Sequence, residues 1–275
     1  MGIKFRLIVM NFLQYAIWGS WLISLGAYLG GGLDFTGLQI GSFFATMGVA
    51  SLFMPAVMGI IADRWIPAQK LLGICHLVSG GFLIAAASQT AYGPLYSCML
   101  LSVMFYMPTI ALSNSVAYNA LDLARLDTVK HFPPIRVWGT VGFIAAMWFV
   151  DLTHIGGVQI KLTEWQLYVS AVLSFLLAVY SFSLPGCPVD RTVKARSWVD
   201  TLGLRAFTLF KEKRMAIFFV FSMLLGAALQ ITNAFGDSYI QSFGSMPQYA
   251  DSAIVKHSVI PVSYTHLTLP TNSLV

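Results

Sequence analysis

Residues 131–150 read HFPPIRVWGTVGFIAAMWFV, two prolines and an arginine followed by an almost unbroken apolar run. A helix from Pro133 to Val150 would be about 27 Å long at 1.5 Å per residue. That length is close to the roughly 30 Å of hydrocarbon in a lipid bilayer. The stretch therefore predicts a membrane-spanning helix with an arginine near one end.

The rest of the chain has the same character. Of its 275 residues, 57% are hydrophobic and only 10% are charged, and the mean hydropathy is +0.74. A soluble domain carries about 25% charged residues, so this composition excludes that class. We predict an all-α polytopic membrane protein. The predicted spans are Leu7–Leu29, Leu38–Ile61, Leu71–Ser88, Leu95–Tyr118, Pro133–Val150, Gln166–Leu184 and Met215–Phe235.

The basic residues predict the orientation of these spans. If the N-terminus lies in the cytoplasm and the spans alternate, every lysine and arginine except Lys161 and Lys256 lies on the cytoplasmic side. This asymmetry is the positive-inside rule, which sets the topology of polytopic membrane proteins. It also explains the isoelectric point of about 9.1 without a nucleic-acid partner.

A polar stretch, residues 185–214, divides the chain. Residues 1–184 are predicted to form a six-helix bundle, and residues 215–260 a seventh helix with the loop that follows it. Within the polar stretch, apolar residues recur at helical spacing beside lysine and arginine, which indicates an amphipathic helix on the inner leaflet. These apolar residues are Val199, Leu202, Ala206, Leu209 and Phe210. Six spans, a basic loop and a new span are typical of a transporter with two bundles.

Three of the predicted spans carry polar or aromatic side chains on one helical face. A central Arg or Asp costs roughly 2.5–3.5 kcal/mol to place in a membrane, so such residues face partners or water. The stripes favour a hydrophilic cavity; the alternative is hydrogen bonding between helices, worth about 0.6–2 kcal/mol per contact. The stripes comprise Asn11, Gln14, Trp18 and Trp21, then Arg136, Thr140 and Phe143, then Gln230, Asn233 and Asp237.

The depth of Arg136 depends on where its helix begins. If the helix begins at Pro133, Arg136 lies in the first turn and its side chain can reach the cytoplasmic surface, although a cation there opposes the helix dipole. If the helix begins near Thr128, the prolines lie inside it and Arg136 lies deeper. The residue pattern alone does not choose between these alternatives.

The sequence does not favour an enzyme or a metal site. Its three cysteines and five histidines are scattered, without the spacing of metal ligands or of a nucleophile and its base. We therefore expect no metal and no cofactor.

Several stretches resemble a known family. In GIIADRW, Gly59, Asp63 and Arg64 match the start of the conformational loop motif of the major facilitator superfamily, although Pro67 departs from the continuation of that motif. The longer stretches FLQYAIWGSWLISLGAY, FMPAVMGIIADRW, FPPIRVWGTVGFIAAMW and LFKEKRMAIFFVFSMLLGAALQITNAFG resemble the bacterial nucleoside:proton symporter family of that superfamily. The resemblance runs in order from about residue 5 to about residue 257.

This resemblance implies the major facilitator fold, two six-helix bundles that alternate access to a central cavity, of which this chain holds the N-terminal bundle and helix 7. It implies proton-driven uptake of purine and pyrimidine nucleosides across the bacterial cytoplasmic membrane. The expected partners are nucleosides, protons and lipid, and the chain is expected to be a monomer. The alternative is a facilitator that carries another small polar solute, such as a sugar.

The resemblance also implies a substrate site. It assigns nucleoside binding to Arg136, Thr140, Phe143, Gln230 and Asn233. The chemistry suits such a ligand, because amides and a guanidinium can bind the polar edges of a nucleoside while Phe143 stacks on the base. Further cavity-lining candidates are Gln14, Trp18 and Asp237.

The end of the chain departs from the family pattern. Residues 261–275, PVSYTHLTLPTNSLV, contain two prolines and no apolar run long enough to span a membrane. We expect this tail to be non-native. The coupling carboxylate is then expected in a C-terminal half that this chain lacks, and the chain alone is expected not to transport.

Overall fold

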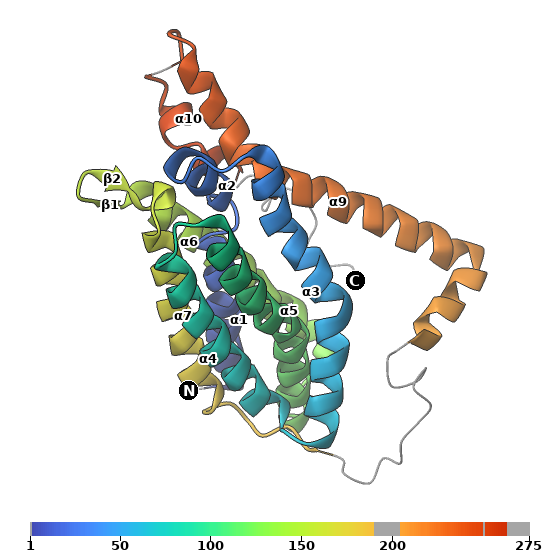
Figure 1. The fold of residues 1–275 in the computed structure, drawn as a ribbon. Coiled ribbons are helices and arrows are strands. Elements are labelled where there is room, and N and C mark those ends of the chain that lie inside the picture. The colour runs from blue at the N-terminus through green and yellow to red at the C-terminus, as the bar shows by residue number, and fades with distance from the viewer. Residues whose placement is uncertain (1, 190–203, 250, 263–275) are drawn as a thin grey trace.

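The computed structural model describes residues 2–189, 204–249 and 251–262. The described chain is almost entirely helical (Figure 1). The long helices are α1 (Ile3–Gly19), α3 (Gly37–Arg64), α4 (Ala68–Ala87), α5 (Tyr92–Leu123), α6 (Thr128–Leu152), α7 (Trp165–Ser181) and α9 (Lys213–Ser242). The short elements are α2 (Leu25–Ala27), a π-helix (Tyr28–Gly32), an antiparallel hairpin of β1 (His154–Ile155) and β2 (Val158–Gln159), 3-10 turns at Ile160–Leu162, Leu204–Lys211 and Phe243–Ser245, and α10 (Ala253–Lys256).

Helices α1 and α3–α7 pack into one bundle, in which α1 lies against α6, α4 lies against α5 and α7, and α3 lies against α5 (Figure 1). Glycines permit the closest crossing, between α1 and α6. A Cβ atom on Gly142 would lie 2.2 Å from the Phe12 carbonyl oxygen, and one on Gly19 would lie 2.3 Å from the Phe143 carbonyl oxygen. Two backbones therefore touch where small residues remove the side chains between them.

The helices agree with the predicted polytopic class. Helices α3, α4, α5, α6 and the segment Lys213–Ser245 are long and apolar enough to cross a bilayer, and α7 is a shorter apolar helix. Each predicted span after the first coincides with one long helix of the described chain. A capping box fixes the start of α3, because the Thr36 hydroxyl accepts from the Gln39 backbone N–H and the Gln39 side chain accepts from the Thr36 N–H.

The first predicted span, Leu7–Leu29, is not one regular helix. Helix α1 ends at Gly19, and turns over residues 20–24 lead into α2 and the π-helix. The Ser20 hydroxyl donates to the Ala16 carbonyl at 2.8 Å and competes with the regular backbone pattern there. Backbone bonds from Leu22 to Trp18 and from Leu25 to Trp21 nevertheless keep the chain on a helical course.

Helix α6 begins five residues before the predicted Pro133. Asp127 caps it by accepting from the Val129 backbone N–H at 2.9 Å, so the helix starts at Thr128 and both prolines lie inside it. Arg136 is then about 12 Å along the helix axis from the first residue. The deeper of the two alternatives for Arg136 is the one that the fold adopts.

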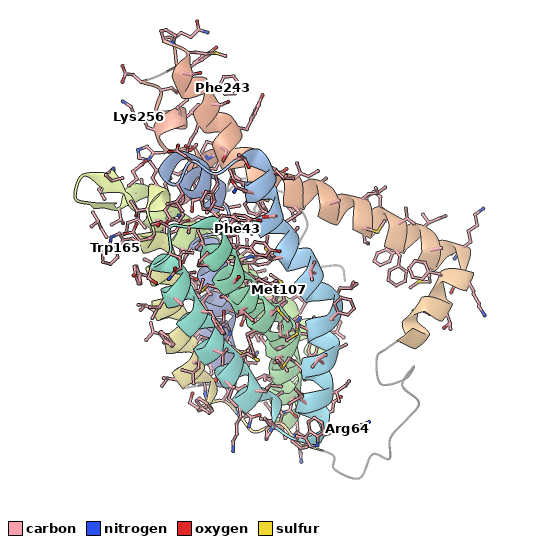
Figure 2. All side chains as sticks on the ribbon, viewed as in Figure 1. Phe43, Arg64, Met107, Trp165, Phe243 and Lys256 are labelled. Carbon is pink, nitrogen blue, oxygen red and sulfur yellow. The ribbon has the colours of Figure 1, made fainter. Side chains whose placement is uncertain are left out.

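The two ends of the bundle differ. Arg64 lies at one end, whereas Trp165 and Lys256 lie at the opposite end, which we call the hairpin end because it carries β1 and β2 (Figure 2). The C-terminal half of α9 packs against the hairpin end, and its N-terminal half extends away from the bundle (Figure 1). At this contact, a Cβ on Gly26 would lie 3.1 Å from both the Ala234 carbonyl oxygen and the Ser238 hydroxyl.

Candidate functional site

A cavity of about 210 Å³ lies between α1, α6 and α9. Helix α6 contributes one helical face at i, i+4 and i+7, and α1 and α9 each present a comparable face. The lining residues are Tyr15, Trp18 and Leu22 from the α1 segment, Arg136, Thr140 and Phe143 from α6, and Gly226, Leu229, Gln230 and Asn233 from α9. The structure thus brings together all five residues predicted to bind substrate, and Trp18 with them.

Several polar atoms at this cavity are buried and make no hydrogen bond within the part of the chain that the structure describes. They are the Tyr15 hydroxyl, Trp18 Nε1, Gln230 Nε2 and Asn233 Oδ1. Leaving such an atom unpaired costs about 1–3 kcal/mol. These unpaired atoms offer both donors and acceptors to the cavity, so the cavity can bind a solute with several polar groups.

The Arg136 guanidinium packs on an aromatic ring and not against a carboxylate. Its guanidinium carbon lies 3.9 Å above the centre of the Tyr15 ring, a cation–π contact. Among the described residues, no carboxylate lies within salt-bridge distance of Arg136. A Cβ on Gly139 would lie 2.6 Å from Tyr15 Cδ2 and 2.8 Å from Arg136 Nη1, so this glycine makes room for the pair.

Aromatic side chains form the apolar wall. Phe143 is 4% exposed, and Trp18 meets it edge to face with the ring centres 6.3 Å apart. Trp18 also contacts Tyr106 at 6.0 Å. The wall is rigid because each ring is fixed by a neighbour, and a flat ligand can lie against it.

The structure does not bring Gln14 to the cavity. Its amide is buried inside the bundle, where Nε2 donates to Thr109 at 2.7 Å and Oε1 lies 2.9 Å from His76 Nε2. The Tyr106 hydroxyl donates to the Gln14 carbonyl at 2.6 Å, and His76 Nδ1 lies 3.2 Å from the Ser174 hydroxyl. Gln14 therefore joins α1 to α4 and α5.

This network makes a prediction about stability. Replacing Gln14 by leucine leaves His76 and Thr109 without their partner, at a cost of about 1–3 kcal/mol. We expect the purified variant to unfold at a lower temperature. Replacement of the half-buried Gln89, whose amide donates to the neighbouring Ser88 hydroxyl, by leucine is the matched control. Equal unfolding temperatures for the two variants would contradict this expectation.

Asp237 also lies outside the cavity. It is completely buried at the hairpin end, where Ser258 donates to its Oδ1 and Gln241 donates to its Oδ2. Gly59, Asp63 and Arg64 lie at the last turn of α3, at the other end of the bundle, and Asp63 is exposed. Within the described ranges, no group of three or more His, Cys, Asp or Glu side chains is placed to hold a metal ion.

The sequence did not identify Tyr15, Leu22, Gly226 or Leu229 as lining residues. Tyr15, Trp18 and Leu22 follow one another at i, i+3 and i+7, which is a helical face offset by about one residue from the polar stripe that contains Gln14. A search for aromatic residues at helical spacing beside Trp18 would have found Tyr15.

Comparisons with known proteins give a matching family profile and several relatives. A family profile described as "Nucleoside H+ symporter" matches residues 1–271. The xanthosine permease of Escherichia coli (strain K12) is 49% identical over 97% of this chain, and the nucleoside permease NupG of the same organism is 44% identical over 98%. The chain spans 63% of the length of each of these relatives. Because they are named permeases, they agree with the prediction that the chain is not an enzyme.

Solved structures give the same result. The crystal structure of the nucleoside transporter NupG superposes with a TM-score of 0.84 and 44% identity over 97% of this chain and 65% of that one. A point mutant of NupG superposes with a TM-score of 0.87 and 45% identity. At this identity the likeness confirms the predicted major facilitator fold, with an N-terminal six-helix bundle followed by helix 7.

Proposed function

Because the chain belongs to the nucleoside H+ symporter family, we propose that the protein carries nucleosides across a membrane together with protons. The observation that carries the proposal is the cavity between α1, α6 and α9. It combines a guanidinium, two amides and two hydroxyls with an aromatic wall. A nucleoside matches both the aromatic wall and the polar groups, since its base is flat and its base edges and ribose are polar.

We assign the roles as follows. The base lies against Phe143, while Gln230 and Asn233 read its polar edge, because one amide presents an unpaired N–H and the other an unpaired carbonyl oxygen. Arg136 donates to ribose hydroxyls or a base carbonyl from its place above Tyr15. Thr140 lies one turn from Arg136 and adds a hydroxyl. The site is complete within one chain for these groups, so we propose that a monomer binds substrate.

The proposed function is tested by uptake. Vesicles that contain the protein expressed from its complete gene should accumulate radiolabelled uridine when a proton gradient, acidic outside, is imposed, and collapse of the gradient should abolish accumulation. Unlabelled xanthosine or adenosine should compete, and glucose should not. The xanthosine permease and the nucleoside permease are this chain's relatives, which favours a nucleoside over a sugar. Competition by glucose with none by nucleosides would replace the nucleoside by a sugar.

We further propose that the protein lies in a bacterial cytoplasmic membrane with its N-terminus in the cytoplasm and the hairpin end outside. Support comes from the positive-inside rule. Arg64, the last residue of α3, and Arg125, in the turn after α5, lie at one end of the helices, whereas Lys161 and Lys256 are at the hairpin end. Lys194, which the same rule places inside, is outside the described residues.

This orientation makes a labelling prediction. In a background without Cys75, Cys98 and Cys187, a cysteine at Val158 should react with a membrane-impermeant thiol reagent added to intact cells. A cysteine at Arg125 should react only after the cells are opened. Both positions are exposed, Val158 in β2 and Arg125 in the turn after α5, so they differ in sidedness rather than in burial. The opposite pattern would invert the proposed topology.

A further inference from the structure

A buried cluster of charged side chains joins α9 to the six-helix bundle at the hairpin end, outside the cavity. Lys161 is 1% exposed, and its Nζ lies 2.6 Å from Asp151 Oδ1 and 4.0 Å from Asp237 Oδ1. Both carboxylates are completely buried. Lysine and aspartate are almost never fully buried unless they are paired, so this arrangement is specific to the conformation that contains it.

Further side chains complete the cluster. His257 Nδ1 lies 3.0 Å from Asp151 Oδ2, and Lys161 Nζ donates to the Ser258 hydroxyl at 3.1 Å. Ser258 and Gln241 in turn donate to Asp237. The cluster therefore ties together the end of α6, the segment before α7, the C-terminal half of α9 and the segment after α10.

The cluster lies directly beyond the cavity. Asp237 is one turn past Asn233 on α9, about 6 Å along the axis, and Asp151 is eight residues past Phe143 on α6, about 12 Å. Beside Asn233 and Asp237 on α9, the Ala234 carbonyl oxygen and the Ser238 hydroxyl lie close to Gly26. Separation of α9 from the bundle at this end would break the cluster and open the cavity toward the hairpin side.

The charges in the cluster do not balance without a proton. One lysine faces two carboxylates, so with His257 neutral the buried site carries a net negative charge. One additional proton on the cluster cancels this charge. When the cluster is open, water solvates each carboxylate and no extra proton is needed. The closed form should therefore hold one more proton than the open form.

We propose that Asp151, Lys161, Asp237 and His257 form a proton-dependent latch that closes the cavity at the hairpin end. The inference rests on the proposed function, because it assigns a step of proton-linked transport to residues of this chain. Since the closed form binds the additional proton, a fall in external pH favours closure, and a rise in external pH favours opening.

Ala234 is a suitable reporter, because it is 2% exposed and lies at the contact that must separate. In a background without native cysteines, intact cells expressing the complete gene with Ala234→Cys are treated with an impermeant thiol reagent at about pH 8 and about pH 6. The labelling of Ala234→Cys is divided by the labelling of Val158→Cys at the same pH. This ratio corrects for thiolate reactivity and for membrane insertion. We expect relative labelling to fall several-fold at the lower pH.

Variants separate the parts of the proposal. Lys161→Met should leave Ala234→Cys strongly labelled at both pH values, because two carboxylates then repel. Asp237→Asn removes the excess negative charge and keeps hydrogen-bonding capacity toward Gln241, so labelling should be low at both. Lys256→Met is the control, since the Lys256–Asp251 pair at the same end is exposed, and it should behave like the parent.

If Ala234→Cys is labelled as weakly in Lys161→Met as in the parent, the proposed latch is wrong. Unchanged pH dependence in Asp237→Asn would overturn the role of the proton. Labelling is measured without any nucleoside, so a failure of nucleoside transport would leave both results readable.

Discussion

Replacing Arg136 by alanine should weaken uridine binding to the purified protein by about 10- to 100-fold, because hydrogen bonds from a charged group contribute about 1.5–3 kcal/mol and 1.4 kcal/mol is a factor of ten. Arg136 lies at the cavity with its guanidinium above Tyr15 and, among the described residues, without an ion-pair partner. Its donors are therefore available to the ligand rather than to the fold.

Two further variants sharpen this expectation. Arg136→Lys keeps the charge but loses the planar fork and its stacking on Tyr15, so affinity should fall between those of the parent and Arg136→Ala. Lys130→Ala is the matched control, because it removes an exposed cation from the same helix. Calorimetric titration with uridine measures all three. Equal affinities for Arg136→Ala and Lys130→Ala would show that Arg136 serves the protein surface only.

Replacing Gly142 by alanine should destabilise the bundle by about 1–3 kcal/mol and lower the unfolding temperature by about 5–10 °C. The new Cβ would lie 2.2 Å from the Phe12 carbonyl oxygen and 2.9 Å from its carbonyl carbon. These are backbone atoms, which cannot turn aside, so α1 and α6 must separate. Because these helices carry Trp18 and Phe143, uridine affinity should fall as well.

The control for this variant is Gly81→Ala on α4, where a Cβ would meet nothing within 4 Å. Alanine is favoured over glycine inside a helix by about 1 kcal/mol, so Gly81→Ala should be as stable as the parent or more stable. A thermal unfolding series in detergent compares the variants. Equal unfolding temperatures for Gly142→Ala and Gly81→Ala would mean that α1 and α6 are not in contact at Gly142.

The sequence predicted the spans and the principal site residues for different reasons. Long apolar runs are decisive for membrane helices, because nothing else in a protein needs about 20 consecutive apolar residues. The α6 and α9 residues of the cavity were assigned from the resemblance to the nucleoside:proton symporter family, and the three α6 residues also follow one helical face. Gln14 was assigned to the same cavity, but α1 is surrounded by neighbours on several sides. Adjacent residues of α1, such as Gln14 and Tyr15, therefore contact different helices.

Other features depended on contacts between distant segments. The start of α6 was misplaced because a double proline usually marks a first turn, whereas the cap at Asp127 starts the helix earlier. Tyr15 meets Arg136 only because Gly139 lacks a side chain. In the sequence, Lys161 and Lys256 are both basic residues on the non-cytoplasmic side. In the structure the Lys161 side chain is 1% exposed and the Lys256 side chain is 55% exposed. They differ because the segment that follows α9 returns to Lys161.

The most direct test of the central claim, that α1, α6 and α9 enclose a nucleoside site, is an experimental structure of the complete protein with bound uridine. We expect the base to lie against Phe143, with Gln230 and Asn233 at its polar edge and the Arg136 guanidinium within hydrogen-bond distance. Uridine bound elsewhere, with the Tyr15 hydroxyl, Gln230 and Asn233 still unpaired in this cavity, would contradict it.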